Sequence, residues 1–341
     1  MNRTDVAEDR ASARLEDMIA GYQRTQVLCV AAKLGLADQL TQGAQRAEAL
    51  ATTVGAEPRA LYRLLRALEF LGIVHEPSPG LFALTDLGER LRAGAPGATH
   101  DALLMTGEAF FPWWGRLEHS IRSGESSVPG IEGVSSFEYL HRHPEQTRRF
   151  NRMMSEMIGA MATGVLSTYD FGRFATVVDV GGGRGTLLSA ILESHPRLRG
   201  VLFDLPATAD EARATIAARG LAGRCECVGG DFFAAVPAGD CIILSAVISD
   251  WDDEKSVAIF KNCRRALAPE GRLVLLERLL VPEEPALQSV FMDLQMLVIG
   301  GGTGRSAAEY RQLLGAAGFE LVSVLPTGTA RSIFEARAVQ E

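Results

Sequence analysis

The chain has 341 residues, of which 47% are hydrophobic and 22% are charged, and its formal net charge is −8. This composition is typical of a globular protein with two or three domains, and the acidic balance argues against nucleic acid or an anionic membrane surface as a partner. The charged first twenty residues lack the apolar stretch of a signal peptide, and no apolar run is long enough to span a bilayer, so we expect a cytoplasmic protein.

Helices with apolar residues every three or four positions are predicted for residues 11–40, with a break at Gly35. Their expected apolar face consists of Ile19, Val27, Val30, Ala31 and Leu34. Residues 47–76 suggest two short helices and a third, and residues 72–85 alternate around a Pro-Gly turn as a small hairpin does. Helices followed by a two-stranded wing predict a winged-helix domain.

A winged helix raises the hypothesis of DNA binding, which the charges do not favour. Between Arg46 and Arg92, both included, six arginines face six acidic residues, so the segment has no net positive charge. A protein that reads a DNA groove needs an excess of positive charge to neutralise phosphates. We therefore expect this domain to serve dimerisation rather than nucleic acid binding.

Residues 100–170 are predicted to be helical and are rich in large side chains. "EAFFPWWGRL" brings Phe110 and Trp113 together, and "FNRMMSEMIGAM" places methionines on one helical stripe with Met154 beside it. Two interpretations remain open for these side chains. They form the core of a buried helix, or they form a plastic apolar wall for a flat organic substrate.

After Phe171, short apolar runs alternate with helical stretches. The expected strands lie in TVVDV, GVLFDL, CECVGGDF, DCIILSAV, GRLVLLERLL, ELVSVLP and SIFEARAV. This rhythm predicts a doubly wound α/β domain, a Rossmann-like parallel sheet with an antiparallel end. We expect a mainly α-helical dimerisation domain over 1–98, linker helices over 99–170 and the sheet domain over 171–341.

The five cysteines, an odd number, indicate reduced thiols rather than a disulfide framework. "CEC" at Cys225–Cys227 raises the question of a metal site, but a strand with both thiols on one face is the better explanation. The six histidines do not cluster, so no metal site is expected.

"VVDVGGGRGTLLSAIL" predicts a strand, a glycine turn and a helix. Gly181, Gly183 and Gly185 give the spacing G-x-G-x-G, which fits neither the dinucleotide fingerprint nor the phosphate loop. Asp204 closes the next strand, where a carboxylate accepts ribose hydroxyls, and Asp231 closes the third, where it accepts from an exocyclic amine. A site for an adenosine without pyrophosphate follows, and S-adenosylmethionine fits it.

The chain resembles the class I O-methyltransferases of the plant caffeate type and their bacterial natural-product relatives over nearly its whole length. "DVGGGRG", "FDLP", "GDFF", "DWDDE", "LLERLLVPE" and "GGTGRSAAEYRQLLGAAGF" carry the resemblance, as do "LYRLLRALEFLGIV", "FALT" and "FNRMMS". It implies a homodimer with a winged-helix dimerisation domain, helices that cap the acceptor pocket, and a C-terminal cofactor domain.

The resemblance also implies a set of site residues. The residues expected to bind S-adenosylmethionine are Arg149, Gly181, Gly183, Asp204, Asp231, Phe232, Ser245 and Trp251. Phe232 would pack on the purine and Arg149 would pair with the carboxylate. The residues expected to contact the acceptor are Phe110, Trp113, Met154 and Met296.

The sequence departs from the family pattern at the catalytic base. The family's usual His-Asp-Trp reads Ser249-Asp250-Trp251 here. Of the two acids that normally orient the histidine, one survives as Glu277 and the other falls at Gly304. Ser249, Asp250 and Glu277 remain the candidate catalytic residues.

Methyl transfer tolerates such a loss, because alignment supplies about 7–11 kcal/mol of a barrier in favourable cases, whereas a general base adds about 10²–10⁴-fold. We therefore expect O-methylation of an aromatic or polyketide-like hydroxyl, driven mainly by positioning. The alternatives are hydroxylation, decarboxylation or a pericyclic step with the donor bound, and a non-catalytic binding protein. A neutral pocket residue explains Ser249 better than a catalytic hydroxyl does, and a helix cap is an alternative explanation of Asp250. The remaining base candidates are Asp250, Glu277 and His119.

Overall fold

In the computed structural model, which describes residues 3–281 and 287–339, the chain divides into two units. One consists of the residues up to Pro112 together with Arg148–Met153, and the other of Trp113–Thr147 together with the residues from Met154 onward. The helical middle of the chain is thus shared between the units. The expected boundaries at residues 98 and 170 stay a prediction.

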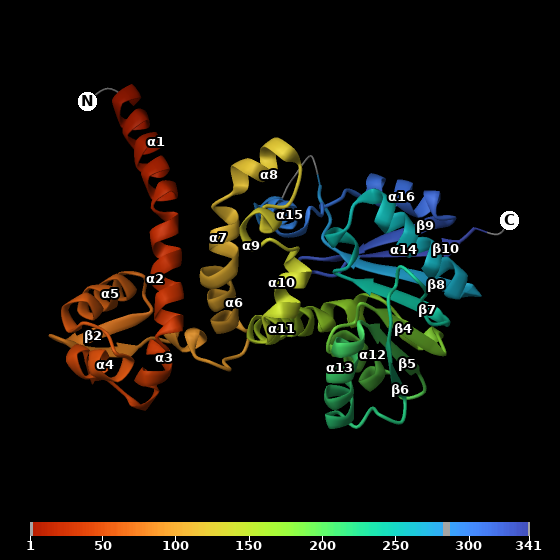
Figure 1. Ribbon diagram of the computed structural model, residues 1–341, viewed down its shortest axis with the longest axis horizontal. Coiled ribbons are helices and arrows are strands. Elements are labelled where there is room, and N and C mark those ends of the chain that lie inside the picture. Colours follow the sequence, from red (N-terminus) through yellow and green to blue (C-terminus); the bar gives the residue numbers. More distant parts are fainter. Residues whose placement is uncertain (1–2, 282–286, 340–341) are drawn as a thin grey trace. The chain divides into compact units, whose positions relative to one another are not determined.

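The first unit is built from helices and a small antiparallel sheet (Figure 1). Its elements are α1 (Arg3–Ile19), α2 (Gly21–Lys33), α3 (Leu36–Gln39), β1 (Gln45–Arg46), α4 (Ala47–Val54), α5 (Pro58–Phe70), β2 (Val74–Ser78), β3 (Leu81–Leu84) and α6 (Thr99–Met105). The sheet order is β1-β3-β2. Leu50, Leu65 and Phe82 are fully buried at the centre of this unit. The winged-helix prediction is confirmed in its helices and its wing.

Residues 47–76 hold only two helices, so the expected third helix in this stretch is wrong. After α5 the chain reverses at Gly72, whose φ is 72°, and Val74–Ser78 then pairs with β3. Backbone pairing to the wing thus replaces a further helical turn.

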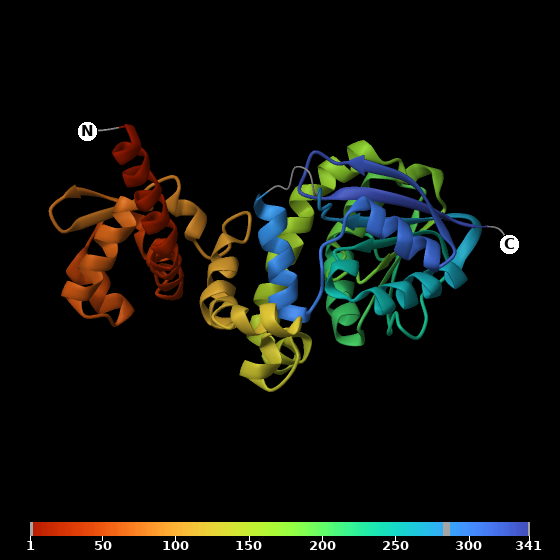
Figure 2. The same ribbon diagram turned by 90° about the horizontal axis from the view of Figure 1, so that it is seen from above.

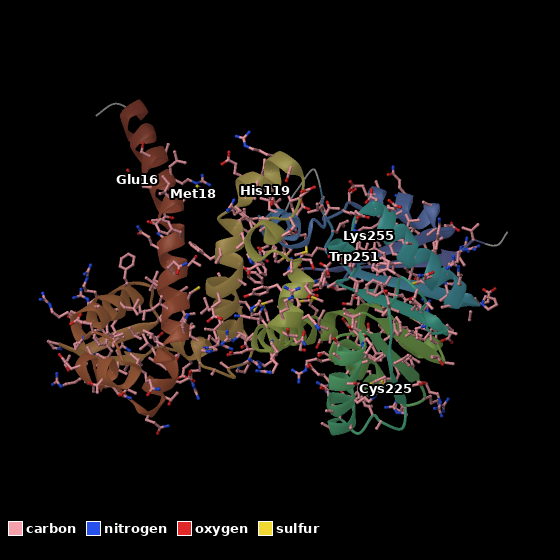
Figure 3. All side chains as sticks on the ribbon, in the orientation of Figure 1. Glu16, Met18, His119, Cys225, Trp251 and Lys255 are labelled. Atoms are coloured by element: carbon pink, nitrogen blue, oxygen red, sulfur yellow. The ribbon has the colours of Figure 1, made fainter. Side chains whose placement is uncertain are left out.

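The first helix leaves apolar side chains exposed. Leu15, Met18 and Ile19 are 61%, 59% and 71% exposed, and Figure 3 labels Met18 on this helix. The expected apolar face is buried at Ala31, which is 3% exposed, and is left open at Ile19 and at Val30, which is 40% exposed. An exposed apolar surface of this kind marks a site of protein association.

The second unit begins with helices and continues into the sheet domain. Its helices are α7 (Phe111–Trp114, which begins in the first unit), α8 (Leu117–Ser123), α9 (Val128–Glu132), α10 (Ser136–Arg142), α11 (Pro144–Thr168, shared with the first unit), α12 (Thr186–Ser194), α13 (Pro206–Ala218), α14 (Asp253–Ala266), α15 (Leu287–Gly300) and α16 (Ala307–Ala316). Its strands are β4 (Thr176–Val180), β5 (Arg199–Asp204), β6 (Cys225–Gly229), β7 (Gly239–Ser245), β8 (Leu267–Glu277), β9 (Phe319–Pro326) and β10 (Ser332–Ala338).

All seven predicted strands form one sheet in the order β6-β5-β4-β7-β8-β10-β9. The first five are parallel, and β10 is antiparallel to both of its neighbours, so the antiparallel end is confirmed. Helices α12 and α13 and the end of α11 pack on one face, and α14 and α16 pack on the other (Figures 1 and 2). Because the parallel strands end together, their following loops share one edge, where ligands of such sheets bind.

The thiols of β6 contact the same apolar cluster, as the strand interpretation of "CEC" predicts: Cys225 is buried in it and Cys227 packs against it. Among the described residues there is no group of three or more His, Cys, Asp or Glu that could hold a metal ion. Nor does any helix within the described ranges have the length and apolar character needed to cross a membrane.

Candidate functional site

The turn after β4 brings three glycines to the carboxyl edge of the sheet. Gly181, Gly183 and Gly185 have φ angles of 71°, 57° and 76°, which side chains with a Cβ rarely adopt. A Cβ on Gly181 would lie 2.7 Å from a methyl carbon of Val247, whereas a Cβ on Gly183 would meet nothing within 4 Å. The turn is therefore packed tightly at Gly181 and open at Gly183, where a ligand can approach the backbone.

Asp204, the last residue of β5, is held beside this turn. Its Oδ2 accepts from the Gly183 N–H at 2.8 Å and its Oδ1 from the Leu205 N–H at 2.7 Å. The Thr208 hydroxyl donates to the same carboxylate. Burial raises the pKa of Asp204, and the two backbone N–H groups oppose that shift. Of its hydrogen-bond donors, only the Thr208 hydroxyl can rotate away in favour of a ligand hydroxyl.

Beneath the turn lies a second carboxyl group, Asp179, which is 1% exposed. Among the described residues its Oδ1 has no hydrogen-bond partner, and a Cβ on Gly182 would come within 2.9 Å of its Cγ. Burial, and then the charge of Asp204, raise the pKa of Asp179 to about 7. The glycine turn thus rests on a carboxyl group that is largely protonated below neutral pH.

The end of β7 shows an unsatisfied polar atom and an unusual backbone. The Ser245 Oγ is buried and has no hydrogen-bond partner among the described residues. The next residue, Ala246, has a φ of 57°, a left-handed conformation that is uncommon for a residue with a Cβ. An unpaired buried hydroxyl and a strained backbone together are typical of a position shaped for a ligand.

Trp251 is the centre of an aromatic cluster. Phe232 and Phe233 contact the indole edge-on at 5.9 and 4.9 Å between ring centroids, and Phe137 from α10 stacks on it at 5.7 Å with an interplanar angle of 6°. The Lys255 ammonium lies 5.8 Å from the indole centroid, and Figure 3 shows both side chains together. Phe232 and Trp251 are thus brought together, as expected for two adenine neighbours.

These residues suit S-adenosylmethionine. The open backbone at Gly183, the carboxylate of Asp204 and the unpaired hydroxyl of Ser245 lie at the ends of β4, β5 and β7, which adjoin one another in the sheet. Asp231 is exposed after β6, and its Oδ1 accepts from the Phe233 N–H at 2.8 Å. The arrangement offers donors and acceptors for an amino acid and a nucleoside, without a cluster of cations for phosphates.

Ser249 lies in a short turn, Ile248–Asp250, that Glu277 holds from β8. Glu277 is completely buried, and its Oε1 accepts from the N–H groups of Val247 and Ile248 at 3.0 and 2.8 Å. Its Oε2 lies 3.4 Å from Arg331, and the Ser249 hydroxyl donates to the same carboxylate. Glu277 therefore acts as an anchor of the turn, with its oxygens already occupied.

Asp250 is partly buried, and its carboxylate makes no hydrogen bond or ion pair with the described part of the chain. Burial, followed by the charge of Glu277, raises the pKa of Asp250 to about 7. The interpretation of Asp250 as a helix cap is wrong, because α14 begins at Asp253 and its cap is Asp252, whose Oδ1 accepts from the Lys255 N–H at 2.8 Å. The Asp250 side chain is thereby left available for chemistry.

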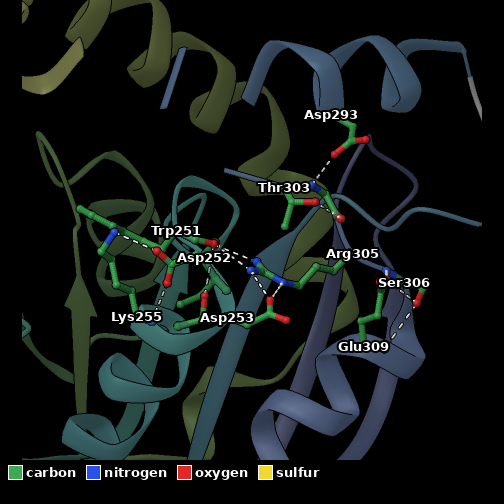
Figure 4. A network of polar contacts seen from close by, with 12 residues as sticks. Trp251, Asp252, Asp253, Lys255, Asp293, Thr303, Arg305, Ser306 and Glu309 are labelled. Atoms are coloured by element: carbon green, nitrogen blue, oxygen red, sulfur yellow. Dashed lines mark hydrogen bonds and ion pairs between the residues drawn. The ribbon is translucent and has the colours of Figure 1, made fainter. Parts of the chain in front are cut away.

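The other support of this turn is Arg305, which is 2% exposed. Its guanidinium donates to the carbonyl oxygens of Ile248 and Trp251 at 3.0 and 2.7 Å and to the Asp253 carboxylate at 2.8 Å (Figure 4). One rigid fork of donors therefore binds both ends of the segment that carries Ser249 and Asp250.

The chain around Gly304 packs closely against the same turn. A Cβ on Gly302 would lie 2.1 Å from the Ser249 carbonyl oxygen, and the Thr303 N–H donates to that oxygen at 3.0 Å. The Gly304 N–H donates to Asp293 at 2.6 Å, and a Cβ on Gly304 would lie 3.1 Å from the same carboxylate oxygen (Figure 4). An acid from α15 thus borders the position where the family usually has a glutamate.

The residues expected to contact the acceptor are placed differently from one another. Met154 on α11 and Met296 on α15 are partly buried. Trp113 is 1% exposed, its Nε1–H donates to Glu132 at 2.9 Å, and its ring meets Tyr139 edge-on at 5.4 Å. Trp113 therefore supports the helices around it, and any contact with an acceptor stays a prediction.

Two expected site residues belong to the first unit. Arg149 Nη1 donates to the Glu108 carboxylate at 2.6 Å. Glu108 lies in the π-helical turn Thr106–Phe110, of which Phe110 is the last residue. Their contacts with donor and acceptor remain predictions. His119 is exposed on α8, and nothing brings it to the catalytic turn.

Sequence reasoning missed several residues of this site. They are Phe137, Asp179, Ala246, Asp293, Arg305 and Arg331. Only Arg305 and Asp179 fall inside the motifs that carried the family resemblance, in "GGTGR" and "DVGGGRG". Phe137, Asp293 and Arg331 act through contacts with other parts of the chain, and Ala246 through its backbone conformation.

Comparison with known proteins gives two family matches. Residues 114–320 match the model of an O-methyltransferase domain, and residues 16–93 match the model of an O-methyltransferase dimerisation domain. Together they account for most of the chain.

Individual relatives agree with these matches. The phenazine O-methyltransferase PhzM of Lysobacter antibioticus is 43% identical, over 96% of each chain. The mitomycin biosynthesis 6-O-methyltransferase of Streptomyces lavendulae is 37% identical, over 96% of this chain and 94% of its own. The crystal structure of an O-methyltransferase from neocarzinostatin biosynthesis, with S-adenosylmethionine and 2-hydroxy-5-methyl naphthoic acid, is 35% identical, covers 92% of this chain and 96% of its own, and superposes with a TM-score of 0.84.

Proposed function

The chain belongs to the S-adenosylmethionine-dependent O-methyltransferases, and on that premise we propose that it methylates a hydroxyl of a flat aromatic or polyketide-like acceptor with Asp250 as proton acceptor. The single observation that carries the proposal is the pairing of a well-formed donor site with a free carboxylate at the catalytic turn. That carboxylate stands one residue after the position where the family has its histidine.

The donor site supports the first half of this proposal. When bound, S-adenosylmethionine supplies a methyl group activated by a sulfonium; transfer forms a C–O bond, and the electron pair of the C–S bond leaves with sulfur. Asp204 would hold the ribose, Ser245 and the Gly183 backbone would orient the amino acid part, and Trp251 with Phe232 would contact the adenine. Fixing the donor in this way supplies alignment, which is worth about 7–11 kcal/mol in favourable cases.

The catalytic turn supports the second half. Glu277 is occupied by two backbone N–H groups, Ser249 and Arg331, so it has no lone pair directed at a substrate proton. Asp250 has a pKa raised to about 7 by burial, and a general base is most effective when its pKa lies near the working pH. Its carboxylate would accept the hydroxyl proton as the oxygen attacks, and release it to solvent afterwards.

The acceptor class follows from the partly buried methionines and from the relatives. Met154 and Met296 offer soft, adaptable apolar surfaces from α11 and α15. The names of the relatives refer to phenazine, mitomycin and a naphthoic acid, all of which contain flat rings. A phenol on such a ring is more acidic than an alcohol, so a weak base suffices.

A homodimer is the expected assembly. The dimerisation domain spans residues 16–93, and α1 exposes Leu15, Met18 and Ile19. Burial of such side chains contributes about 25 cal/mol for each Å² of apolar surface removed from water. Sedimentation of the full chain tests this expectation, and a monomer at micromolar concentration contradicts it.

Incubation with methyl-labelled S-adenosylmethionine and a panel of hydroxylated phenazines, naphthoates and quinones tests the function. We expect label in the product and one S-adenosylhomocysteine formed for each methyl transferred. A product that forms while the donor stays intact overturns the proposal in favour of non-methylating chemistry. No transfer to any panel member, with donor binding intact, overturns the acceptor class.

A further inference from the structure

Two arginines face each other at the end of the sheet beside the catalytic turn. Arg278 directly follows Glu277 at the end of β8, and Arg331 directly precedes Ser332 at the start of β10. Ser332 pairs with Glu277 in the antiparallel register. Continuing that register by one residue sets Arg278 opposite Arg331, where side chains of neighbouring strands meet.

Neither guanidinium has all of its donors paired within the described chain. Arg278 has no hydrogen bond and no ion pair within residues 3–281 and 287–339, and its Nε is buried without a partner. Arg331, 7% exposed, has its Nη1 3.4 Å from both the Leu276 carbonyl oxygen and the Glu277 carboxylate, and its Nε is likewise unpartnered. Buried donors left unpaired are costly, and each such group calls for an explanation.

The electrostatics point the same way. Burial, and then the charge of Arg331, lower the pKa of Arg278. Like charges directly opposite on neighbouring strands destabilise a sheet unless an anion lies between them. The acids near Arg331 are Glu277, already bonded to three other groups, and Asp250, whose pKa burial raises to about 7. Neither of them acts on the pKa of Arg278.

The position assigns this unused charge to the acceptor rather than to the methyl donor. Of the donor residues, Gly183 and Asp204 lie at the ends of β4 and β5, and β8 is two strands beyond β4 in the sheet. Ser245, on the adjoining strand β7, pairs with Leu276, two residues before Arg278. Neighbouring strands are about 4.8 Å apart, so β8 lies about 10 Å from the strand that precedes Gly183. Arg331, which lies opposite Arg278, contacts the Glu277 carboxylate at 3.4 Å and opposes the rise that burial causes in the pKa of Asp250, so the pair of arginines borders the turn that carries the proposed base.

We propose that Arg278, assisted by Arg331, binds a carboxylate carried by the acceptor, so that the substrate is a hydroxylated aromatic acid rather than a neutral phenol. The inference rests on the proposed function for the identity of the ligand as an acceptor. A planar guanidinium fork matches a carboxylate with two parallel hydrogen bonds, which fixes the ring as well as holding it. The hydroxyl to be methylated is thereby oriented toward Asp250.

A binding experiment tests the anion site without turnover. The enzyme is saturated with S-adenosylhomocysteine and titrated by calorimetry with 1-naphthoate, which lacks a hydroxyl, and with the neutral 1-naphthamide. We expect naphthoate to bind at least tenfold more tightly, and Arg278→Gln to remove that preference, since charge-assisted hydrogen bonds are the strong ones. Equal binding of the two compounds, or an unchanged preference in the variant, overturns the proposal.

A kinetic experiment separates this inference from the proposed function. Hydroxynaphthoic acids and their methyl esters are compared as acceptors, and Arg278→Gln is expected to raise the KM of the acid about 10- to 100-fold while leaving the ester and the donor KM unchanged. If acid and ester are both methylated with no preference for the acid, the inference about Arg278 is overturned while the proposed function stands. Methylation of neither contradicts the proposed function, and the binding experiment still decides on Arg278.

Two controls exclude a purely structural arginine. Arg337→Gln removes an exposed charge from β10 that pairs with Glu320, and it should leave acid and ester kinetics unchanged. Glu283 and Glu284 lie outside the described residues, so the second control tests whether either of them pairs with Arg278. Arg278→Gln should keep or raise the Tm of the ligand-free enzyme. A lower Tm that disappears in the Glu283→Gln/Glu284→Gln background overturns the proposal.

Discussion

The donor side and the acceptor side of this sheet edge are built in different ways. On the donor side, Gly183 and Asp204 stand at the ends of neighbouring strands and bond directly to each other through the Gly183 N–H. On the acceptor side, the turn Ile248–Asp250 is held by Glu277 and by Arg305, which are distant in sequence. The donor site depends on short local motifs, whereas the catalytic geometry depends on long-range contacts. Substitutions on the two sides should therefore fail in different ways.

The largest effect is expected on the donor side. Asp204→Ala should weaken S-adenosylhomocysteine binding at least about 100-fold, because ribose hydroxyls lose a charged acceptor and the Gly183 N–H loses its partner. Calorimetry measures the affinity, and Asp210→Ala, which removes an exposed acid from α13, is the matched control. Unchanged affinity in Asp204→Ala contradicts the assignment of the donor site.

Removal of Arg305, which holds the catalytic turn, should lower turnover rather than donor affinity. Arg305→Met leaves the Ile248 and Trp251 carbonyl oxygens unpaired, and misplacement of the turn should lower kcat about 30- to 100-fold. Donor affinity should change by less than about threefold. Arg311→Met, an exposed position on α16, is the control. A loss of donor affinity equal to the loss of kcat would show that the two sides are not separate.

The proton acceptor gives a pH-dependent effect. Asp250 must be ionised to act, and its pKa is raised by burial to about 7, so wild-type kcat should rise with pH through about 7 and level off above it. Asp250→Asn should lower kcat about 10- to 30-fold at pH 8 and remove that rise. Asp252→Asn, which retains a helix cap on the exposed side of the same segment, should keep the profile. An unchanged profile in Asp250→Asn assigns the rise to the acceptor hydroxyl.

The smallest effect is expected at the position of the missing histidine. Ser249→Ala removes one donor to Glu277, which retains two backbone N–H groups and Arg331. Turnover should fall by less than about tenfold, and donor affinity should stay unchanged. Assays with methyl-labelled donor measure the turnover, and calorimetry measures the affinity. A loss of activity as large as that of Asp250→Asn, in a folded variant, would make the Ser249 hydroxyl part of the chemistry.

Much of the fold was predictable because its patterns are local. Seven apolar runs gave seven strands, including the antiparallel end, and the Pro-Gly hairpin gave the wing. The one wrong element has a local reason, because Gly72 reverses the chain where a third helix was expected. Ile19 belongs to an apolar pattern that one chain alone leaves exposed.

The sequence by itself determined the family, the donor motif and the absence of a histidine at Ser249, because these depend on residue types at short spacings. Only the tertiary structure decided that Asp252 caps α14 and frees Asp250, that Glu277 is an anchor, and that Arg278 stands opposite Arg331. Charge, burial and unpaired hydrogen bonds are properties of groups brought together from distant parts of the chain, and no spacing along a sequence records them.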